Sequence, residues 1–430
     1  MEAFIGRMRI LLLLSLGLIG RTVSAAEVTL EQIWALVQAQ QTQITELSDE
    51  LERTKVRLAA TTHELAKTAD QAVLTEQRLT LTADYLTEIQ TQGDNAKTSL
   101  GGYGELHYSR INADDSTRDQ QEVDFHRFVM MFGHEFSERV RFFSEIEIEH
   151  SLVKDTDDGS NGGEVEIEQA FIEFELNDNH YARAGLFLLP IGILNETHEP
   201  PTFYGVERND VENIIIPSTW WEAGAGAGGR YYNGLSWDFA VHSGLQVPTT
   251  GASAFRVRSG RQKVAHASAD ELAYTLRVKY TGVAGLELSA SYHHQQDASQ
   301  FGGDGLDAGD LLSVHGIWQH GPFNLRALWA QWQFEGTAAA LADADKQTGW
   351  YIEPSVKFTL PQSEWGIYTR YEDLDGARTR DRFEQWEFGV NYWPTDNVVL
   401  KADYRNREHS DSSDFGRDFR AFDFGLGYHF

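Results

Sequence analysis

The sequence predicts an all-β transmembrane barrel of 16 antiparallel strands, preceded by a long α-helical coiled coil. Two observations predict the barrel: segments of about ten residues with alternating apolar and polar side chains recur from Leu100 onward, and short and long connections alternate between them. A third observation, an unbroken heptad pattern that begins near Leu30, predicts the coiled coil.

The composition excludes several classes of function. The chain has 430 residues, with 36 basic and 65 acidic side chains and a formal net charge of −29. Nucleic acid is therefore not an expected partner, because a phosphate backbone requires a basic surface. The chain has no cysteine, which excludes disulfides, thiolate metal sites and a lipid-anchored N-terminal cysteine. Aromatic residues make up 12% of the chain, in keeping with the interfacial girdles of a barrel.

Residues 1–26 have the pattern of a cleavable signal peptide. Two arginines, Arg7 and Arg9, precede the apolar run Ile10 to Ile19, and the small residues Ala25 and Ala26 follow it. A transmembrane helix is the alternative, but this run is about half of the roughly 20 residues that a helical span needs. We therefore expect export of the chain and cleavage near Ala25 or Ala26.

Residues 27–92 predict a coiled coil. One heptad position is almost entirely apolar and reads Leu30, Val37, Ile44, Leu51, Leu58, Leu65, Ala72, Leu79 and Leu86. A single amphipathic helix lying on a globular domain is the alternative. A helix of about 60 residues would extend about 90 Å, so such a rod requires partner helices. Gly93 and Asn95 end the pattern, and residues 93–99 are expected to form a linker.

Residues 100–430 predict the barrel. The expected short connections lie near Ser137, Asn177–His180, Asn233, Gly282–Gly285, His320–Pro322, Pro361–Ser363 and Pro394–Asn397. The expected long connections are 112–122, 151–163, 189–221, 244–270, 296–308, 335–349, 373–383 and 408–418. Such alternation is typical of barrels with tight periplasmic turns and long external loops, and it places the coiled coil in the periplasm. A soluble sandwich or sheet is the alternative, but it would not require this alternation.

Two strands show local irregularities. The segment Glu164 to Leu176 changes parity near Gln169, which suggests a β-bulge. One face of a later strand carries only small side chains, those of Ala223, Ala225 and Ala227. We interpret that face as a candidate subunit contact.

The last ten residues alternate most clearly. Phe422, Phe424, Leu426, Tyr428 and Phe430 share one face, as in a two-faced strand. This ending also resembles the closing strand of bacterial outer-membrane porins, in which a terminal Phe acts as an assembly signal.

A passage in the middle of the barrel region resembles the phosphate-selective porin O and P family. It consists of Arg183-Ala184-Gly185 followed by Pro190-Ile191-Gly192, and the likeness extends roughly from Leu100 to Phe430. The resemblance implies that the third long loop, about 189–221, folds into the barrel and narrows it. The candidate residues of the constriction and lumen are Arg183, Glu196, Glu199, Glu207, Arg208, Asp210, Glu212, Arg230, Arg277, Lys279, Arg326 and Arg370.

The charge pattern departs from a phosphate pore, which should line its narrowing with basic side chains. Carboxylates share one face on two early strands, at Glu145, Glu147, Glu149, Glu164, Glu166 and Glu168, whereas most inward basic residues lie on later strands. We expect an acidic wall opposite a more basic one and a transverse field that orients dipolar or zwitterionic solutes. The alternative for any single carboxylate, and the more common case on a barrel wall, is a solvated lining residue.

The resulting expectation is a passive outer-membrane channel for small hydrophilic solutes or ions, phosphate or other anions among them. The alternatives are a structural tether whose coiled coil reaches toward the cell wall, and an enzyme. The sequence has no Gly-x-Ser-x-Gly motif, and neither His293-His294 nor His198-Glu199 has metal-ligand spacing, so no catalytic residue, cofactor or metal is expected. The expected partners are outer-membrane lipid and lipopolysaccharide, two further copies of the chain in a homotrimer formed through the coiled coil and the barrel wall, and the cell wall.

Overall fold

The structure is a computed structural model that describes residues 97–153, 163–300, 305–360 and 363–430, together with Gln38, Gln41 and Lys55. The predicted signal peptide lies outside the described residues, as does the predicted coiled coil apart from these three positions. The chain divides into two units, Met1–Lys67 and Thr68–Phe430, and every described strand belongs to the second.

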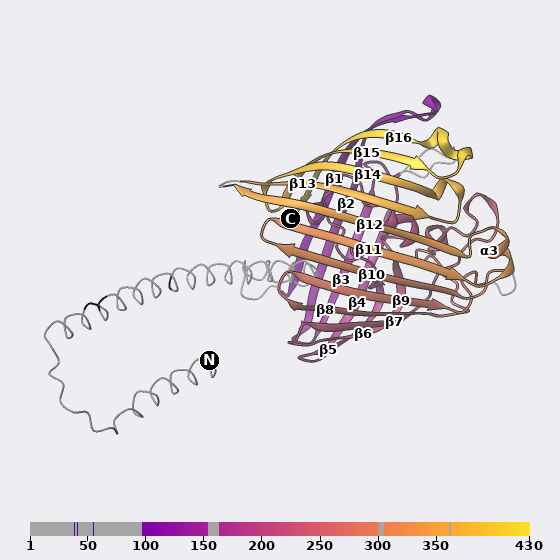
Figure 1. Ribbon diagram of the computed structural model, residues 1–430. Coiled ribbons are helices and arrows are strands. Elements are labelled where there is room, and N and C mark those ends of the chain that lie inside the picture. Colours follow the sequence, from indigo (N-terminus) through magenta and orange to yellow (C-terminus); the bar gives the residue numbers. More distant parts are fainter. Residues whose placement is uncertain are drawn as a thin grey trace, which may run out of the picture. The chain divides into compact units, whose positions relative to one another are not determined.

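Sixteen antiparallel strands form one closed barrel (Figure 1). They are β1 (Thr98–Ala113), β2 (Gln120–Ser137), β3 (Val140–Glu149), β4 (Val165–Asn177), β5 (His180–Leu188), β6 (Trp221–Arg230), β7 (Leu235–His242), β8 (Ala273–Val283), β9 (Leu286–Gln295), β10 (Gly309–His320), β11 (Phe323–Phe334), β12 (Lys346–Leu360), β13 (Ser363–Asp375), β14 (Arg382–Thr395), β15 (Val398–His409) and β16 (Phe419–His429). Each strand pairs with its neighbours in sequence, and β1 pairs with β16 to close the sheet. The predicted fold class is confirmed for the barrel.

Short helical segments lie in the connections. They are η2 (Ser116–Arg118), η3 (Pro200–Thr202), η4 (Val211–Ile215), η5 (Gly251–Ser253), η6 (Val257–Gly260), α3 (Thr337–Leu341), η7 (Thr379–Asp381) and η8 (Ser412–Arg417). No helix in the described ranges combines the length and the apolar character needed to span a membrane.

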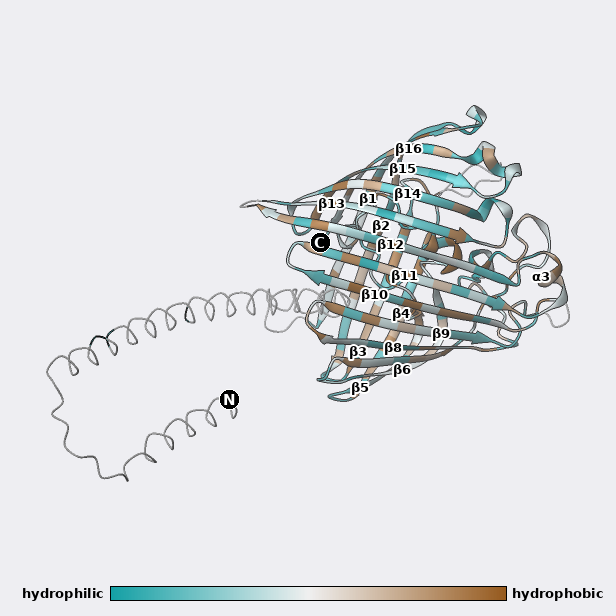
Figure 2. Ribbon diagram, viewed as in Figure 1, coloured by the Kyte–Doolittle hydropathy of each residue, from teal (hydrophilic) through white to brown (hydrophobic). Residues whose placement is uncertain are grey.

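The strands form the wall because their side chains alternate between two environments. In β8, Tyr274, Leu276 and Val278 are exposed on the outer face, whereas Thr275 and Arg277 are buried on the inner face. Figure 2 shows the same alternation of hydrophobic and hydrophilic residues along other strands. An apolar outer face and a polar inner face are what a barrel in a lipid bilayer requires.

The predicted parity change in β4 is confirmed. Gln169 pairs with Glu145 and Ile167 pairs with Ile146, so Glu168 has no partner of its own on β3. An extra residue of this kind is a β-bulge. It turns the Glu168 side chain into the buried interior of the barrel.

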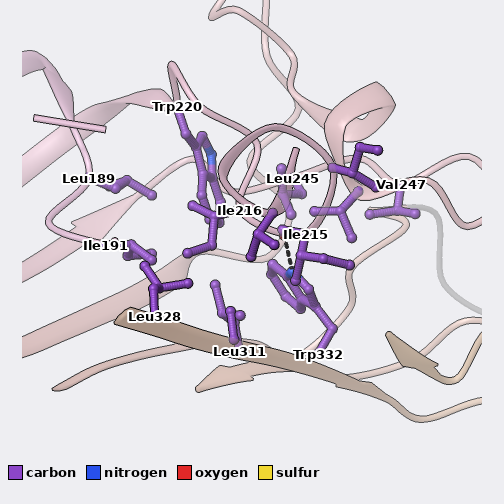
Figure 3. Close-up of a cluster of buried hydrophobic side chains, with 14 of the residues drawn as sticks. Leu189, Ile191, Ile215, Ile216, Trp220, Leu245, Val247, Leu311, Leu328 and Trp332 are labelled. Atoms are coloured by element: carbon purple, nitrogen blue, oxygen red, sulfur yellow. Dashed lines mark hydrogen bonds between the residues drawn. The ribbon is translucent and has the colours of Figure 1, made fainter. Parts of the chain in front are cut away.

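Short and long connections alternate as the sequence predicts, so all the long loops leave the barrel at one end. Two of them contribute to the interior: L3, residues 189–220 between β5 and β6, and L4, residues 243–272 between β7 and β8. Both loops supply residues to a large buried apolar cluster that also includes wall residues such as Leu311, Leu328 and Trp332. In Figure 3, Ile215 and Ile216 of L3 lie close to Leu245 of L4 and to Trp332 of β11. The barrel interior therefore contains a hydrophobic core that the two loops and the wall build together.

Candidate pore constriction

L3 crosses the barrel interior because wall side chains bind its backbone. Ser291 of β9 donates to the carbonyl of Pro190 at 2.8 Å, and Arg326 of β11 donates to that of Thr202 at 2.9 Å. Further donors lie on β11, β14 and β15, and they pair as Trp332 with Ile215 (2.8 Å), Asn391 with Tyr204 (3.0 Å) and Lys401 with Gly205 (2.7 Å). L3 therefore leaves β5, reaches the opposite wall at β14 and β15, and returns to β6.

Acidic side chains of L3 add a second set of contacts with the wall. Glu196 forms an ion pair with Arg277 of β8, and Asp210 forms one with Arg407 of β15. Glu207 lies 3.0 Å from Nδ1 of His107 on β1. Burial alone would raise the pKa of Glu207, but its hydrogen bond and charge interaction with His107 hold that pKa well below the usual range. Three of the predicted lumen residues are thus anchors of the loop.

Glu212 organises the inside of L3. Its Oε2 accepts hydrogen bonds from the amides of Ile193 and Leu194, each at 2.7 Å, and its Oε1 accepts one from the Tyr351 hydroxyl at 2.8 Å. Gly192 permits this approach because its φ is +76° and a β-carbon there would lie 2.5 Å from Oε2. The Glu212 side chain is fully buried, so its carboxylate faces the loop backbone.

L4 packs against L3 from the long-loop end. Arg258 and Arg261 donate to the carbonyls of Ser218 and Thr219, respectively. Gln347 of β12 donates to the carbonyl of Phe255 at 2.8 Å, which holds the tip of L4 across the barrel from its own strands. L4 is therefore a second inward loop, whereas the sequence predicted only an external connection.

The two loops bring four arginines together: Arg208 of L3 with Arg256, Arg258 and Arg261 of L4, here called the arginine cluster. All four are partly exposed, and none forms an ion pair with a carboxylate in the described ranges. Burial, followed by the charges of neighbouring arginines, lowers the pKa of Arg258. Guanidinium groups nevertheless stay protonated near neutral pH, so the arginine cluster presents positive charge without a direct ion pair, although carboxylates such as Glu168 and Glu166 lie near enough to interact with Arg261.

A small cavity lies against L3 toward the short-turn end, where Gly285 and Gln319 line it. Four predicted lumen residues meet there: Glu196, Arg277, Lys279 and Arg326. Arg277 is neutralised by Asp238, at 2.6 Å, and by Glu196. Lys279 and Arg326 form no ion pair within the part of the chain that the structure describes.

The wall charges are mostly neutralised locally. Arg370 pairs with Glu353, Glu372 and Glu387 at 3.1, 3.1 and 2.5 Å. On the early strands, Arg127 of β2 lies 2.6 Å from Glu105 and 3.1 Å from Glu147. The predicted acidic and basic walls therefore each contain their own countercharges.

The remaining predicted residues lie apart from this constriction or are buried within it. Arg183 stacks over the ring of Phe187, 4.3 Å from its centroid, and Arg230 lies 5.1 Å from that of Tyr181. Glu199 is buried in L3, and burial raises the pKa of its carboxyl group. The sequence-based prediction omitted Arg256, Arg258 and Arg261, although four basic residues within positions 256–263 stand out in so acidic a chain.

A family model, phosphate-selective porin O and P, matches residues 99–430. The chain belongs to this porin family. The porin is 31% identical over 352 residues to an Aquifex aeolicus protein described as uncharacterized, a match that covers 74% of this chain and 77% of the relative. Family membership and the closed barrel make it a channel of the bacterial outer membrane rather than an enzyme.

Two solved structures share the fold of the porin. The anion-selective porin from Comamonas acidovorans matches with a TM-score of 0.53 and 12% identity, over 77% of this chain and 99% of that one. Salmonella typhi OmpF, in a complex with daunomycin, matches with a TM-score of 0.51 and 15% identity, over 77% and 97% of the two chains. At these identities the likeness concerns the barrel alone.

Proposed function

We propose that the porin conducts small hydrophilic anions. Two positively charged groups, the arginine cluster and the pair Lys279 and Arg326, would attract the anions on either side of L3. One observation carries the proposal: these six basic side chains face the interior without a carboxylate partner in the described ranges. Because several arginines lie together, an entering anion relieves their mutual repulsion.

The interior carboxylates support the same direction of selectivity. Glu105, Glu145, Glu147 and Glu168 are at most 3% exposed, so they offer little surface to a passing cation. The arginine cluster is accessible by comparison. Small oxyanions such as inorganic phosphate match guanidinium groups well, because arginine donates in a fork to two oxygens of one anion.

The proposal is tested by the reversal potential of the purified porin in a planar bilayer separating two KCl concentrations. We expect a sign that indicates preference for chloride over potassium. In the double variant Arg258→Gln and Arg261→Gln, the ratio of anion to cation permeability should fall several-fold. At an effective dielectric constant near 20, a unit charge about 10 Å from the ion path contributes roughly 1.7 kcal/mol before salt screening.

Arg139→Gln is the control, because this exposed arginine lies at the short turn between β2 and β3 and its loss removes one positive charge away from the constriction. It should leave the permeability ratio unchanged. A wild-type preference for potassium, or an equal shift in the control and the double variant, contradicts the proposal. The decrease in chloride current on addition of phosphate then shows which of the two anions the pore binds more tightly.

We further propose that the long loops face the exterior, that the short turns face the periplasm with the coiled coil, and that three copies associate. The outer face of β5 and β6 supports a subunit contact, because Ala182 pairs with Ala227 and Ala184 pairs with Ala225 there. These small side chains give a shallow surface on which a second wall could pack closely. Crosslinking of the purified porin followed by mass measurement tests the trimer.

A further inference from the structure

Three buried side chains from three elements converge where L3 meets the early strands. Nε2 of His198 in L3 lies 3.4 Å from Oε1 of Glu145 on β3 and 3.6 Å from Oε2 of Glu168 at the bulge of β4. All three ligand atoms lie within 4.8 Å of one another. The exposed fractions of these residues are 2%, 0% and 0%.

The opposite side of each group is already held by a neighbour. Nδ1 of His198 lies 3.3 Å from the carbonyl of Asn195, Gln169 donates to Oε2 of Glu145 at 2.6 Å, and Thr219 donates to Oε1 of Glu168 at 2.5 Å. When Nδ1 carries the proton and donates it to this carbonyl, the lone pair of Nε2 faces the two carboxylates. Metal-binding histidines and carboxylates are commonly oriented by such outer partners.

The converging atoms themselves have no hydrogen bonds. Nε2 of His198, Oε1 of Glu145 and Oε2 of Glu168 are buried and unpartnered. Their separations exceed the roughly 2.7–2.9 Å of a charge-assisted hydrogen bond. The two distances from Nε2 of His198 to the carboxylate oxygens are close to the distance of about 3.4 Å between two neighbouring ligand atoms of a tetrahedral Zn²⁺. That distance follows from metal–ligand bonds of about 2.1 Å.

A second histidine cluster on the same side of the barrel provides a contrast. His107 lies near Glu207 and His126, but its two ring nitrogens have carboxylate partners at 3.0 and 3.2 Å, in Glu207 and Glu105. That imidazole is satisfied by the protein. In the His198 cluster the carboxylates lie farther from the imidazole, at 3.4 and 3.6 Å, and the buried carboxylate of Glu199, which has an unpartnered oxygen, interacts electrostatically with it.

We propose that Glu145, Glu168 and His198 bind a divalent transition-metal ion that ties L3 to β3 and β4. One imidazole with two carboxylates suits Zn²⁺ and similar ions better than Mg²⁺ or Ca²⁺, which prefer all-oxygen sites. The sequence gives no sign of the site, because its ligands come from two strands and a loop. The ion would also cancel negative charge beside Arg208, which donates to the carbonyl of His198 at 3.4 Å.

Calorimetric titration of the chelator-stripped, folded porin with Zn²⁺ tests the site. We expect one tight site per chain in the wild type and at least a 100-fold loss of affinity in His198→Ala and in Glu168→Gln. Thr219→Val keeps all three ligands but removes an outer partner, and it should weaken binding by roughly tenfold. With Co²⁺ as the probe, the wild type should show the strong visible absorption of a four-coordinate ion, and His198→Ala should not.

Glu287→Gln is the matched control, since Glu287 is another buried inward glutamate that pairs with a histidine, His315, at 3.1 Å. It should bind Zn²⁺ as the wild type does. Heat-modifiable electrophoretic mobility establishes that each variant is a folded barrel before titration. Wild-type affinity in both His198→Ala and Glu168→Gln, or no tight site in the folded wild type, overturns the proposal. Metal binding is measured without current, so its outcome is independent of ion selectivity.

Discussion

At the scale of single residues, two carboxylates of L3 hold the loop in different ways. Glu212 accepts hydrogen bonds from backbone amides of its own loop, whereas Glu207 pairs with His107 on the wall. The sequence pattern marks both as lumen charges and does not distinguish them. Whether a carboxylate contacts water, a backbone amide or a cation depends on the folded path of the loop. The alternation of residues along the strands does not determine that path.

The first residue-level prediction concerns Glu212→Gln. The amide would keep the shape of the side chain but replace one acceptor oxygen with a donor, so the amides of Ile193 and Leu194 or the Tyr351 hydroxyl would lose a partner. We expect the local opening of L3 to become easier by about 2 kcal/mol or more, which is roughly 30-fold. Hydrogen–deuterium exchange at Ile193 and Leu194 measures the change.

The control for this prediction is Glu335→Gln, at an exposed position in the connection that follows β11. It should leave exchange in L3 unchanged. Equal exchange rates in Glu212→Gln and the wild type would show that the carboxylate does not hold the loop.

At the scale of elements, the strands were predictable and L4 was not. Period-two alternation and turn residues are local signals, so the sequence located the sixteen strands and the bulge at Glu168. The inward path of L4 depends on distant contacts, such as those of Arg258 with Ser218 and Gln347 with Phe255. The one local signal is the basic run that begins at Arg256. It indicates that the loop is positively charged, but not whether the loop folds into the barrel or away from it.

The element-level prediction concerns Phe255→Ala. Phe255 is 6% exposed at the tip of L4 and has a φ of 58°, a conformation that costs a non-glycine residue about 1–2 kcal/mol. Packing must therefore hold the tip in place. Removing the ring should cost about 3–5 kcal/mol of local packing and release the arginines that follow it. We expect faster trypsin cleavage after Arg256, Arg258 and Arg261, identified by the masses of the fragments.

Leu341→Ala is the matched control for L4, because Leu341 is an apolar loop residue that is 90% exposed on α3. Its cleavage pattern should match that of the wild type. If Phe255→Ala is cut no faster than the control, packing of the L4 tip does not shield these arginines.

At the scale of the whole molecule, the closing strand has the place that its alternation predicted. β16 pairs with both β15 and β1, and the amide and carbonyl of Phe430 form hydrogen bonds of 2.8 and 2.9 Å with Gly102. The Phe430 side chain itself is 52% exposed. The backbone of Phe430 therefore takes part in closure, while its ring stacks with that of Phe128 at 6.3 Å between centroids.

The whole-molecule prediction concerns Phe430→Ala. If the ring is an assembly signal, the variant should accumulate less in the outer membrane, yet the barrel that does fold should lose no more than about 1–2 kcal/mol of stability. The first is measured as the folded fraction in membranes, and the second by urea unfolding. Phe424→Ala, in β16 and 53% exposed, is the control and should assemble normally. Equal assembly of the two variants argues against a signal at the terminal ring.

The way in which the wall binds L3 has a consequence for how such a protein can diversify. Three wall residues each donate a hydrogen bond to a carbonyl of the loop backbone: Arg326, Asn391 and Lys401. Because the acceptor is a backbone atom, these contacts do not depend on which side chain the loop carries at that position. Tyr204 packs against Tyr368 and Trp393 and so helps to hold the loop, but substitutions of loop side chains that face the passage leave these three backbone contacts in place. The selectivity of the passage can thus be altered by substituting those side chains while the wall residues that bind the loop backbone are kept.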